Sequence, residues 1–293
     1  MKSYWLITLA LFLALVPPGW AQDPLHGFMD LRAGSRLGDD PYQKDETLAE
    51  ARLQLDWNHL GTAIEYRLRA DFLADPVAEQ TDLDLDTGSG WIDLREANLL
   101  FSPIGWIDVK LGRQILTWGT GDLLFINDLF PKDWRAFFIG RDVEYLKAPS
   151  DAVLISMFPR WANIDLAVTP RFDADRYIRG ERISYWNPAL VRIAGRDQII
   201  DPIAQDNAEL ALRVYRTVRG FELAAYGYDG YWKSPRGFDA ATGRASFQPL
   251  TVVGASARGP VGKGILSLEV GHYSSRDDAS GADPFVPNAE LRL

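Results

Sequence analysis

Charged side chains of both signs are concentrated in one long segment of this sequence, residues 117–149. Where a passage narrows, such side chains create an electrostatic field that sorts dissolved solutes. The candidates for this role are Asp122, Asp128, Lys132, Asp133, Arg135, Arg141, Asp142 and Glu144. Because both signs occur together, the segment suits polar solutes better than strict selection for one ion sign.

Covalent catalysis has little support in the sequence. The three histidines, His26, His59 and His272, lie far apart, and no Gly-x-Ser-x-Gly motif is present. His272 with Ser274 or Ser275 is only a nominal pair for a lipase-type site. The absence of cysteine excludes thiolate chemistry and cysteine-ligated metals. We therefore predict no enzyme and no catalytic residue.

One acidic string resembles a metal site only superficially. Asp82, Asp84 and Asp86 alternate along the chain, and Asp93 follows. A calcium loop of the helix-loop-helix type requires Gly at its sixth position and Glu at its twelfth, where this chain has Thr87 and Asp93. The pattern favours a solvated acidic loop, with a loose surface calcium site as the alternative. We predict no metal and no cofactor.

The elements that position these residues are predicted to be β-strands. Polar and apolar residues alternate in segments of about ten residues, the length that a tilted strand needs to cross a bilayer. In residues 61–75, for example, Ile64, Tyr66, Leu68, Ala70 and Phe72 alternate with Glu65, Arg67, Arg69 and Asp71. The predicted strands are 26–34, 46–57, 62–75, 91–101, 106–116, 150–159, 162–171, 207–217, 220–231, 249–258 and 264–274, with 288–293 as the start of a twelfth.

Short and long links alternate between these segments, which distinguishes a barrel from a soluble sandwich. The links near 58–61, 102–105, 159–162, 217–220 and 259–264 are short, whereas 35–45, 76–90, 117–149, 172–205, 232–247 and 274–287 are long. Outer-membrane barrels have short turns on the periplasmic side and long loops outside. We therefore predict an all-β, antiparallel transmembrane β-barrel with about 11–12 strands visible and an incomplete C-terminus.

In such a barrel the polar positions of the strands face a wet lumen. The lumen-wall candidates are Arg52, Glu65, Arg67, Arg69, Asp71, Asp93, Arg95, Asp108, Lys110, Arg213, Glu222 and Glu269. Each could equally be a structural wall residue that pairs across strands.

The N-terminus has the features of a secretory signal. Lys2 precedes an apolar run over residues 5–16, which is too short for a membrane-spanning helix, and Gly19 and Ala21 provide a cleavage site. We predict a signal peptide at 1–21 and a barrel at 22–293. The net charge of −9 argues against a nucleic-acid partner.

Residues 106–149 contain a recognisable motif, formed by Leu111, Gly112, Arg113, Gln114, Trp118 and Gly119. This Leu-Gly-Arg-Gln and Trp-Gly pattern resembles that of a largely uncharacterised family of proteobacterial porin-type outer-membrane barrels, akin to alginate-export channels. The resemblance implies transport across the outer membrane without naming a substrate. Members of that family are usually longer than this chain.

Arg113 conflicts with simple alternation, which would place it on the lipid face beside Leu111 at a cost of roughly 2–4 kcal/mol in mid-bilayer. Two solutions are open: a bulge at Gly112 that turns Arg113 inward, or a position high enough to reach the head groups.

The placement of segment 117–149 is also open. Its apolar side chains need burial: Leu123, Leu124, Phe125, Ile126, Leu129, Phe130, Trp134, Phe137, Phe138 and Ile139. The segment either folds into the lumen as a constriction, or forms an external cap or a contact with a neighbouring subunit while its charges are solvated.

From these patterns we predict a porin-like outer-membrane channel for passive diffusion of small polar or charged solutes. Its partners would be outer-membrane lipid, the solutes themselves and further copies of the chain. The alternatives are a structural barrel that docks a periplasmic or surface partner, and an export channel for a polysaccharide.

Overall fold

The computed structural model describes residues 25–77, 82–121, 123–187, 191–196, 201–278 and 280–293. The predicted signal peptide at 1–21 and the candidate Asp122 lie outside the described residues.

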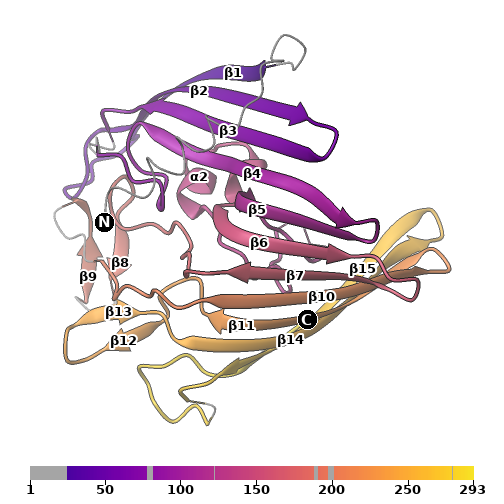
Figure 1. The fold of residues 1–293 in the computed structure, drawn as a ribbon. Helices are drawn as coiled ribbons and strands as arrows, with labels where there is room; N and C mark the ends of the chain where they lie inside the picture. Colours follow the sequence, from indigo (N-terminus) through magenta and orange to yellow (C-terminus); the bar gives the residue numbers. More distant parts are fainter. Residues whose placement is uncertain (1–24, 78–81, 122, 188–190, 197–200, 279) are drawn as a thin grey trace.

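One antiparallel sheet of twelve strands dominates the structure (Figure 1). Each strand pairs with the next one along the chain, and β1 and β16 end the strand order. The strands are β1 (Leu25–Ser35), β2 (Glu46–Leu60), β3 (Ile64–Ala74), β4 (Ile92–Ile104), β5 (Ile107–Ile115), β6 (Pro149–Met157), β7 (Asn163–Thr169), β10 (Glu209–Val218), β11 (Phe221–Tyr231), β14 (Pro249–Val261), β15 (Gly264–Ser275) and β16 (Glu290–Arg292). The predicted all-β antiparallel fold is confirmed, with strand ends shifted by a few residues.

Small elements lie in the long links, where no secondary structure was predicted. Two short hairpins pair β8 (Tyr185–Asn187) with β9 (Arg192–Ala194) and β12 (Gly237–Asp239) with β13 (Arg244–Ser246). Segment 117–149 contains the helix α2 (Trp134–Phe138) and the 3-10 helix η2 (Val143–Leu146). Elements of this length lack a periodic pattern long enough to read from sequence.

Strand register gives the sheet two chemically different faces. In the β2–β3 pair, Gln54 lies opposite Asp71 on one face and Leu53 lies opposite Phe72 on the other. We call the face with Gln54 and Asp71 the inner face, because segment 117–149 lies against it. The outer face exposes apolar side chains that alternate with inner residues, for example Leu31 (68% exposed), Val253 (65%) and Leu268 (59%).

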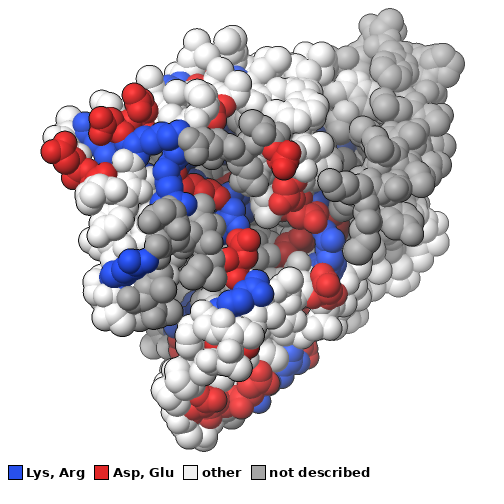
Figure 2. Space-filling view, turned by 90° about the vertical axis from the view of Figure 1, so that its left-hand side faces the viewer, with Lys and Arg blue, Asp and Glu red and all other residues white. Residues whose placement is uncertain are grey.

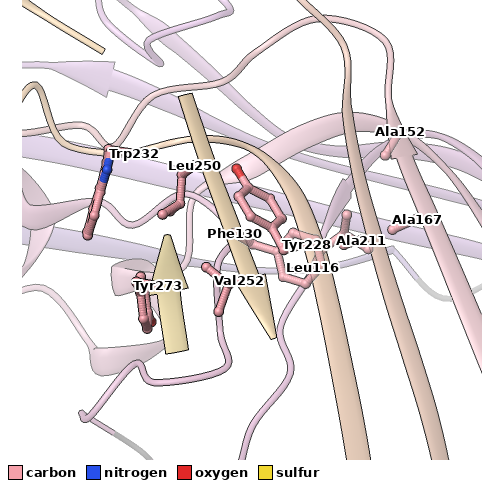
Figure 3. Close-up of a cluster of buried hydrophobic side chains, with 10 residues drawn as sticks. All are labelled: Leu116, Phe130, Ala152, Ala167, Ala211, Tyr228, Trp232, Leu250, Val252 and Tyr273. Atoms are coloured by element: carbon pink, nitrogen blue, oxygen red, sulfur yellow. The ribbon is translucent and has the colours of Figure 1, made fainter. Parts of the chain in front are cut away.

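The inner face itself is divided. On β2–β4 it carries buried charged residues, including Arg52, Asp71, Asp93 and Arg95. On β6–β15 it carries small and aromatic residues that pack with Leu116 and Phe130 of the link after β5 (Figure 3). The cluster consists of Leu116, Phe130, Ala152, Ala167, Ala211, Tyr228, Trp232, Leu250, Val252 and Tyr273. One half of the sheet is therefore suited to apolar packing and the other to ion pairing.

A register shift does occur, but on β4 rather than at Gly112. Arg69 of β3 pairs with Glu96 and Ala70 pairs with Leu94, which leaves Arg95 as the extra residue of a bulge. The pairing of β5 with both neighbours runs unbroken through Gly112, opposite Asn98 and Ala152. The bulge considered for Gly112 is therefore absent from the register.

Gly112 still has an unusual backbone, with φ of +111°. A Cβ atom at this position would meet the carbonyl oxygen of Ala97 on the neighbouring strand. Only glycine adopts this conformation without strain.

Substitution of Gly112 should therefore damage the sheet. We expect Gly112→Ala to lower the free energy of unfolding by about 1–3 kcal/mol, because it adds both backbone strain and a steric clash. The measurement is the urea midpoint of the heat-shifted electrophoretic band in detergent. Gly227→Ala on β11 is the control, because a Cβ there meets no atom within 4 Å. Equal midpoints for the two variants would contradict this account.

Candidate functional site

Segment 117–149 is anchored at one end to the last strands of the sheet. The Asn127 amide donates to the carbonyl oxygen of Ala255 on β14 at 3.3 Å. The Tyr273 hydroxyl on β15 donates to the carbonyl oxygen of Ile126 at 2.5 Å. These contacts place the first part of the segment against the apolar half of the inner face.

The second part of the segment is anchored to the first strands. The Arg141 guanidinium pairs with the Glu50 carboxylate on β2. The Gln54 amide on β2 donates to the Tyr145 hydroxyl at 2.6 Å, and Arg95 on β4 donates to the carbonyl oxygen of Lys147. The segment thus extends along the inner face from β14–β15 to β2–β4, and α2 lies within the curve of the sheet (Figure 1).

A buried ion cluster joins this segment to β4 and to the link after β7. Arg176 donates to both carboxylate oxygens of Asp93, at 2.9 and 3.0 Å, and to Asp133 at 3.2 Å. Asp133 also accepts a hydrogen bond from the backbone N–H of Ala136 and so caps α2. All three charged side chains are less than 10% exposed.

The electrostatics of the cluster keep Asp133 ionised. Burial opposes ionisation of the carboxyl, but the nearby Arg176, Arg135 and Arg141 outweigh burial and lower the pKa of Asp133. For Arg176, burial alone would lower the pKa, whereas Asp93 and Asp133 raise it above the ordinary arginine value. The cluster is therefore held together in its charged form.

Tyr145 of η2 forms a second buried centre. Its ring lies 4.3 Å from the guanidinium carbon of Arg52 and 4.9 Å from that of Arg95. Arg52 also pairs with Glu50 at 3.1 Å and with Asp71 at 3.7 Å. Cation–π contacts and ion pairs together account for how so many charges are buried on β2–β4.

The apolar part of the segment packs only partly. Trp118 meets the Phe130 ring edge-on, with ring centroids 4.9 Å apart. The prediction that all ten apolar side chains are buried is wrong for four of them, namely Leu123, Leu124, Phe137 and Phe138, which are 41–73% exposed. The inner face of β6–β15 packs against Phe130 and its neighbours, but it does not cover these four side chains.

The remaining charged candidates of the segment have different environments. Asp128 and Lys132 form a buried ion pair at 2.9 Å. Asp142 is exposed, and Glu144 is 65% exposed while it pairs with Arg69 at 2.7 Å. Arg135 is half-buried and donates to the Ser89 hydroxyl at 3.0 Å and to the carbonyl oxygen of Thr87.

Most of the other predicted wall residues are paired across neighbouring strands. Arg67 and Arg69 share Asp56 at 2.9 Å each, and Arg213 pairs with Glu222 at 2.7 Å. Asp108 accepts a hydrogen bond from the Ser102 hydroxyl, and Glu269 accepts one from the backbone N–H of Thr120. Lys110 is half-buried and Glu65 is exposed. Cross-strand pairing of these charged side chains therefore stabilises the sheet.

Arg113 of the Leu-Gly-Arg-Gln motif pairs with a residue that we did not predict from the sequence. It is 4% exposed and forms a two-pronged ion pair with Asp151 on β6, at 2.8 and 2.9 Å. It also donates to the carbonyl oxygen of Leu85 in the link after β3. Gln114 is fully buried and donates to the carbonyl oxygen of Ala152 at 2.9 Å. The motif thus connects β5, β6 and the link after β3.

Trp118 and Gly119 of the motif shape the beginning of segment 117–149. Gly119 has φ of +89°, and a Cβ there would lie 2.9 Å from a carboxylate oxygen of Glu269. The glycine therefore allows the chain to pass close to β15.

The acidic string does not converge on a common point. Asp84 binds the backbone and hydroxyl of its own turn, through Asp86 and Thr87, while Asp93 pairs with Arg176. No group of three potential metal ligands occurs within the described ranges.

The His272 ring nitrogen Nδ1 lies 3.4 Å from the Ser274 hydroxyl on the outer side of β15. This is a long contact between neighbours on one strand, and it adds no third group to orient the ring.

Several residues of the site were missed by sequence reasoning. Arg176 lies in the long link after β7, where no periodic pattern marks it. Asp151 was assigned to a strand but not paired with Arg113. Glu50 could have been found, because it continues the polar alternation of Arg52, Gln54 and Asp56. No sequence pattern identifies Tyr145 as a site residue, because an aromatic residue in a long link can have many roles.

Two cavities are lined in part by residues of the segment. One, of about 360 Å³, is lined by residues of β2, β3, α2 and the links that follow β3 and β7. The other, of about 410 Å³, lies near Lys132, Trp232 and Tyr273. Seen from the end that carries β8, β9, β12 and β13, the described surface mixes acidic and basic side chains (Figure 2).

Comparisons with known proteins give distant structural matches only. No family model and no curated protein matches the sequence. Among solved structures, the chain is similar to OprB of Pseudomonas putida in its high-pH structure, with 16% identity and a TM-score of 0.34. The match covers 85% of this chain but only 64% of that one. This likeness concerns the all-β antiparallel architecture alone. No helix in the described part of the chain is long and apolar enough to span a membrane.

Because Arg176 neutralises two buried carboxylates, we expect its substitution to destabilise the protein strongly. Arg176→Met should lower the free energy of unfolding by about 3–5 kcal/mol, because it leaves Asp93 and Asp133 buried without their partner. Limited proteolysis of the folded protein should then cut segment 117–149 faster. Arg192→Met on the exposed β9 is the control. Unchanged proteolysis and stability in Arg176→Met would show that the cluster does not hold the segment.

Asp173, in the link after β7, should make the stability of the folded protein depend on pH, because its pKa is raised. Burial raises its pKa to about 6, with Asp151 acting in the same direction against Lys233 and Arg113. Between its ordinary pKa of 3.8 and about 6, the folded protein keeps a proton that the unfolded chain has lost. This contribution to stability is complete at low pH and disappears as pH rises through about 6.

Lowering the pH from about 7 to about 5 should therefore raise the free energy of unfolding by an amount on the order of 1 kcal/mol, seen as a higher urea midpoint. In Asp173→Asn, which mimics the neutral carboxyl, this difference should shrink. Asp142→Asn on the exposed surface is the control for loss of one charge. A pH response that Asp173→Asn leaves intact would assign it to another group.

Proposed function

We propose that this protein is an outer-membrane channel for passive diffusion of small polar or charged solutes, with segment 117–149 as its constriction. The observation that carries the proposal is that the segment extends along the inner face, bonded to β14–β15 at one end and to β2–β4 at the other. An external cap would contact the rims of the strands and leave the inner face open.

The two faces of the sheet support a place in the outer membrane. Leu31, Val253 and Leu268 expose large apolar surfaces on the outer face. In water such exposure is unfavourable, whereas in a bilayer these side chains would face hydrocarbon. Charged residues lie on the inner face, where a wet passage would solvate or pair them.

The mixed signs around the segment favour polar solutes over one ion type. Arg141, Arg135 and Lys132 lie within the same segment as Asp128, Asp133 and Glu144, and most of them are paired. Paired charges of opposite sign create a transverse field without a large net potential.

The absence of cysteine allows a direct test of the constriction. Phe138, at the end of α2, is 55% exposed and can be replaced by cysteine. In planar bilayers, a charged thiol reagent should lower the conductance of Phe138→Cys by roughly half, because it adds bulk and charge where the passage is narrow. Leu37→Cys in the link after β1 is the control, since Leu37 is fully exposed.

Labelling is verified by mass, and folding by heat-shifted migration in detergent. If labelled Phe138→Cys conducts like the unlabelled channel, segment 117–149 does not line the pathway. If the folded protein gives neither conductance nor solute-dependent swelling of liposomes, the channel proposal fails. A partner that co-purifies in that case would favour the structural barrel.

A further inference from the structure

The cavity of about 360 Å³ combines charged and apolar walls. Its size falls within the range of about 300–1,000 Å³ that is typical of small-molecule sites. Arg135 of α2 lies on its charged side, and Leu73, Pro76, Trp91 and Ile139 lie on its apolar side. Trp91 is 51% exposed, so the apolar wall reaches the surface.

The carboxylates that line the cavity are each neutralised by a contacting guanidinium, as the following ion pairs show. Glu50 pairs with Arg141, Asp75 with Arg182 at 2.6 Å, Asp133 with Arg176 at 3.2 Å, and Glu181 with Arg179 at 2.6 Å. Asp133 and Glu181 also attract Arg135 electrostatically, but neither forms an ion pair with it.

Arg135 is consequently a cation without an ion pair among the described residues. Its guanidinium donates only to neutral oxygens, the Ser89 hydroxyl at 3.0 Å and the Thr87 carbonyl. A guanidinium has five N–H donors, so several remain for a ligand. Burial is the main cause of the lowered pKa of Arg135; Arg176 and Arg179 act in the same direction, and Asp133 and Glu181 oppose them.

We propose that this cavity binds a small organic acid, with the carboxylate on Arg135 and the hydrocarbon part on the wall formed by Leu73, Pro76, Trp91 and Ile139. The inference rests on the proposed channel function only in that the ligand would be a solute on its way through the lumen. A planar guanidinium matches a carboxylate with two parallel hydrogen bonds. A single unpaired arginine suits a single negative charge, and the apolar wall favours an organic anion over an inorganic one.

Calorimetry on the detergent-refolded protein at low salt tests this directly, with benzoate as the probe and benzamide as its neutral analogue. Benzoate should bind and benzamide should not, because only the carboxylate meets Arg135. Arg135→Gln should weaken benzoate binding about tenfold or more. Arg192→Gln removes the same charge from an exposed site and should leave the affinity unchanged.

A second variant tests the apolar wall independently of Arg135. The wild-type protein should prefer benzoate to acetate, and Trp91→Ala should reduce this preference while acetate binding stays the same. Heat-shifted migration confirms that each variant is folded. The inference is overturned if wild-type protein does not bind benzoate, if benzamide binds equally well, or if Arg135→Gln binds like wild type.

Conductance separates this inference from the channel proposal. A conducting protein without affinity for benzoate would contradict the organic-acid site and leave the channel intact. A protein that binds benzoate through Arg135 but does not conduct would support the site and contradict the channel.

Discussion

The pairing of Arg176 with Asp93 and Asp133 is the interaction on which the rest of the site depends. Each carboxylate lies in a buried position where an uncompensated charge would cost several kcal/mol. Because Asp93 belongs to β4 and Asp133 caps α2, one guanidinium fixes the helix against the sheet. Arg135 on the same helix is thereby held at the cavity.

The division of the inner face explains why segment 117–149 extends from one set of strands to another. Its first part provides Phe130 and Trp118 to the small and aromatic side chains of β6–β15. Its second part provides Arg141 and Tyr145 to the charged side chains of β2–β4. If the second part lay against the apolar cluster instead, Arg141 would be buried away from Glu50.

Features that depend on neighbouring residues in one strand could be predicted from the sequence, whereas contacts between distant residues could not. Strand alternation predicted the twelve-stranded sheet and most polar inward positions, because the period of two is imposed by each strand's own backbone. The Arg113 problem was recognised from the same alternation, yet neither proposed solution included Asp151. The pairing of β5 with β6 joins residues that are 38 positions apart, and no periodic pattern records such a contact.

The sequence by itself determined the antiparallel all-β fold, the alternation of short and long links, and the presence of a charged, apolar segment in the middle of the chain. Only the tertiary structure decided which charges are paired, that Phe138 and Leu124 stay exposed, and that Arg135 forms no ion pair with another described residue. The physical reason is that alternation is a property of one strand. The partner of a buried charge, by contrast, is chosen by the packing of links that are distant in sequence.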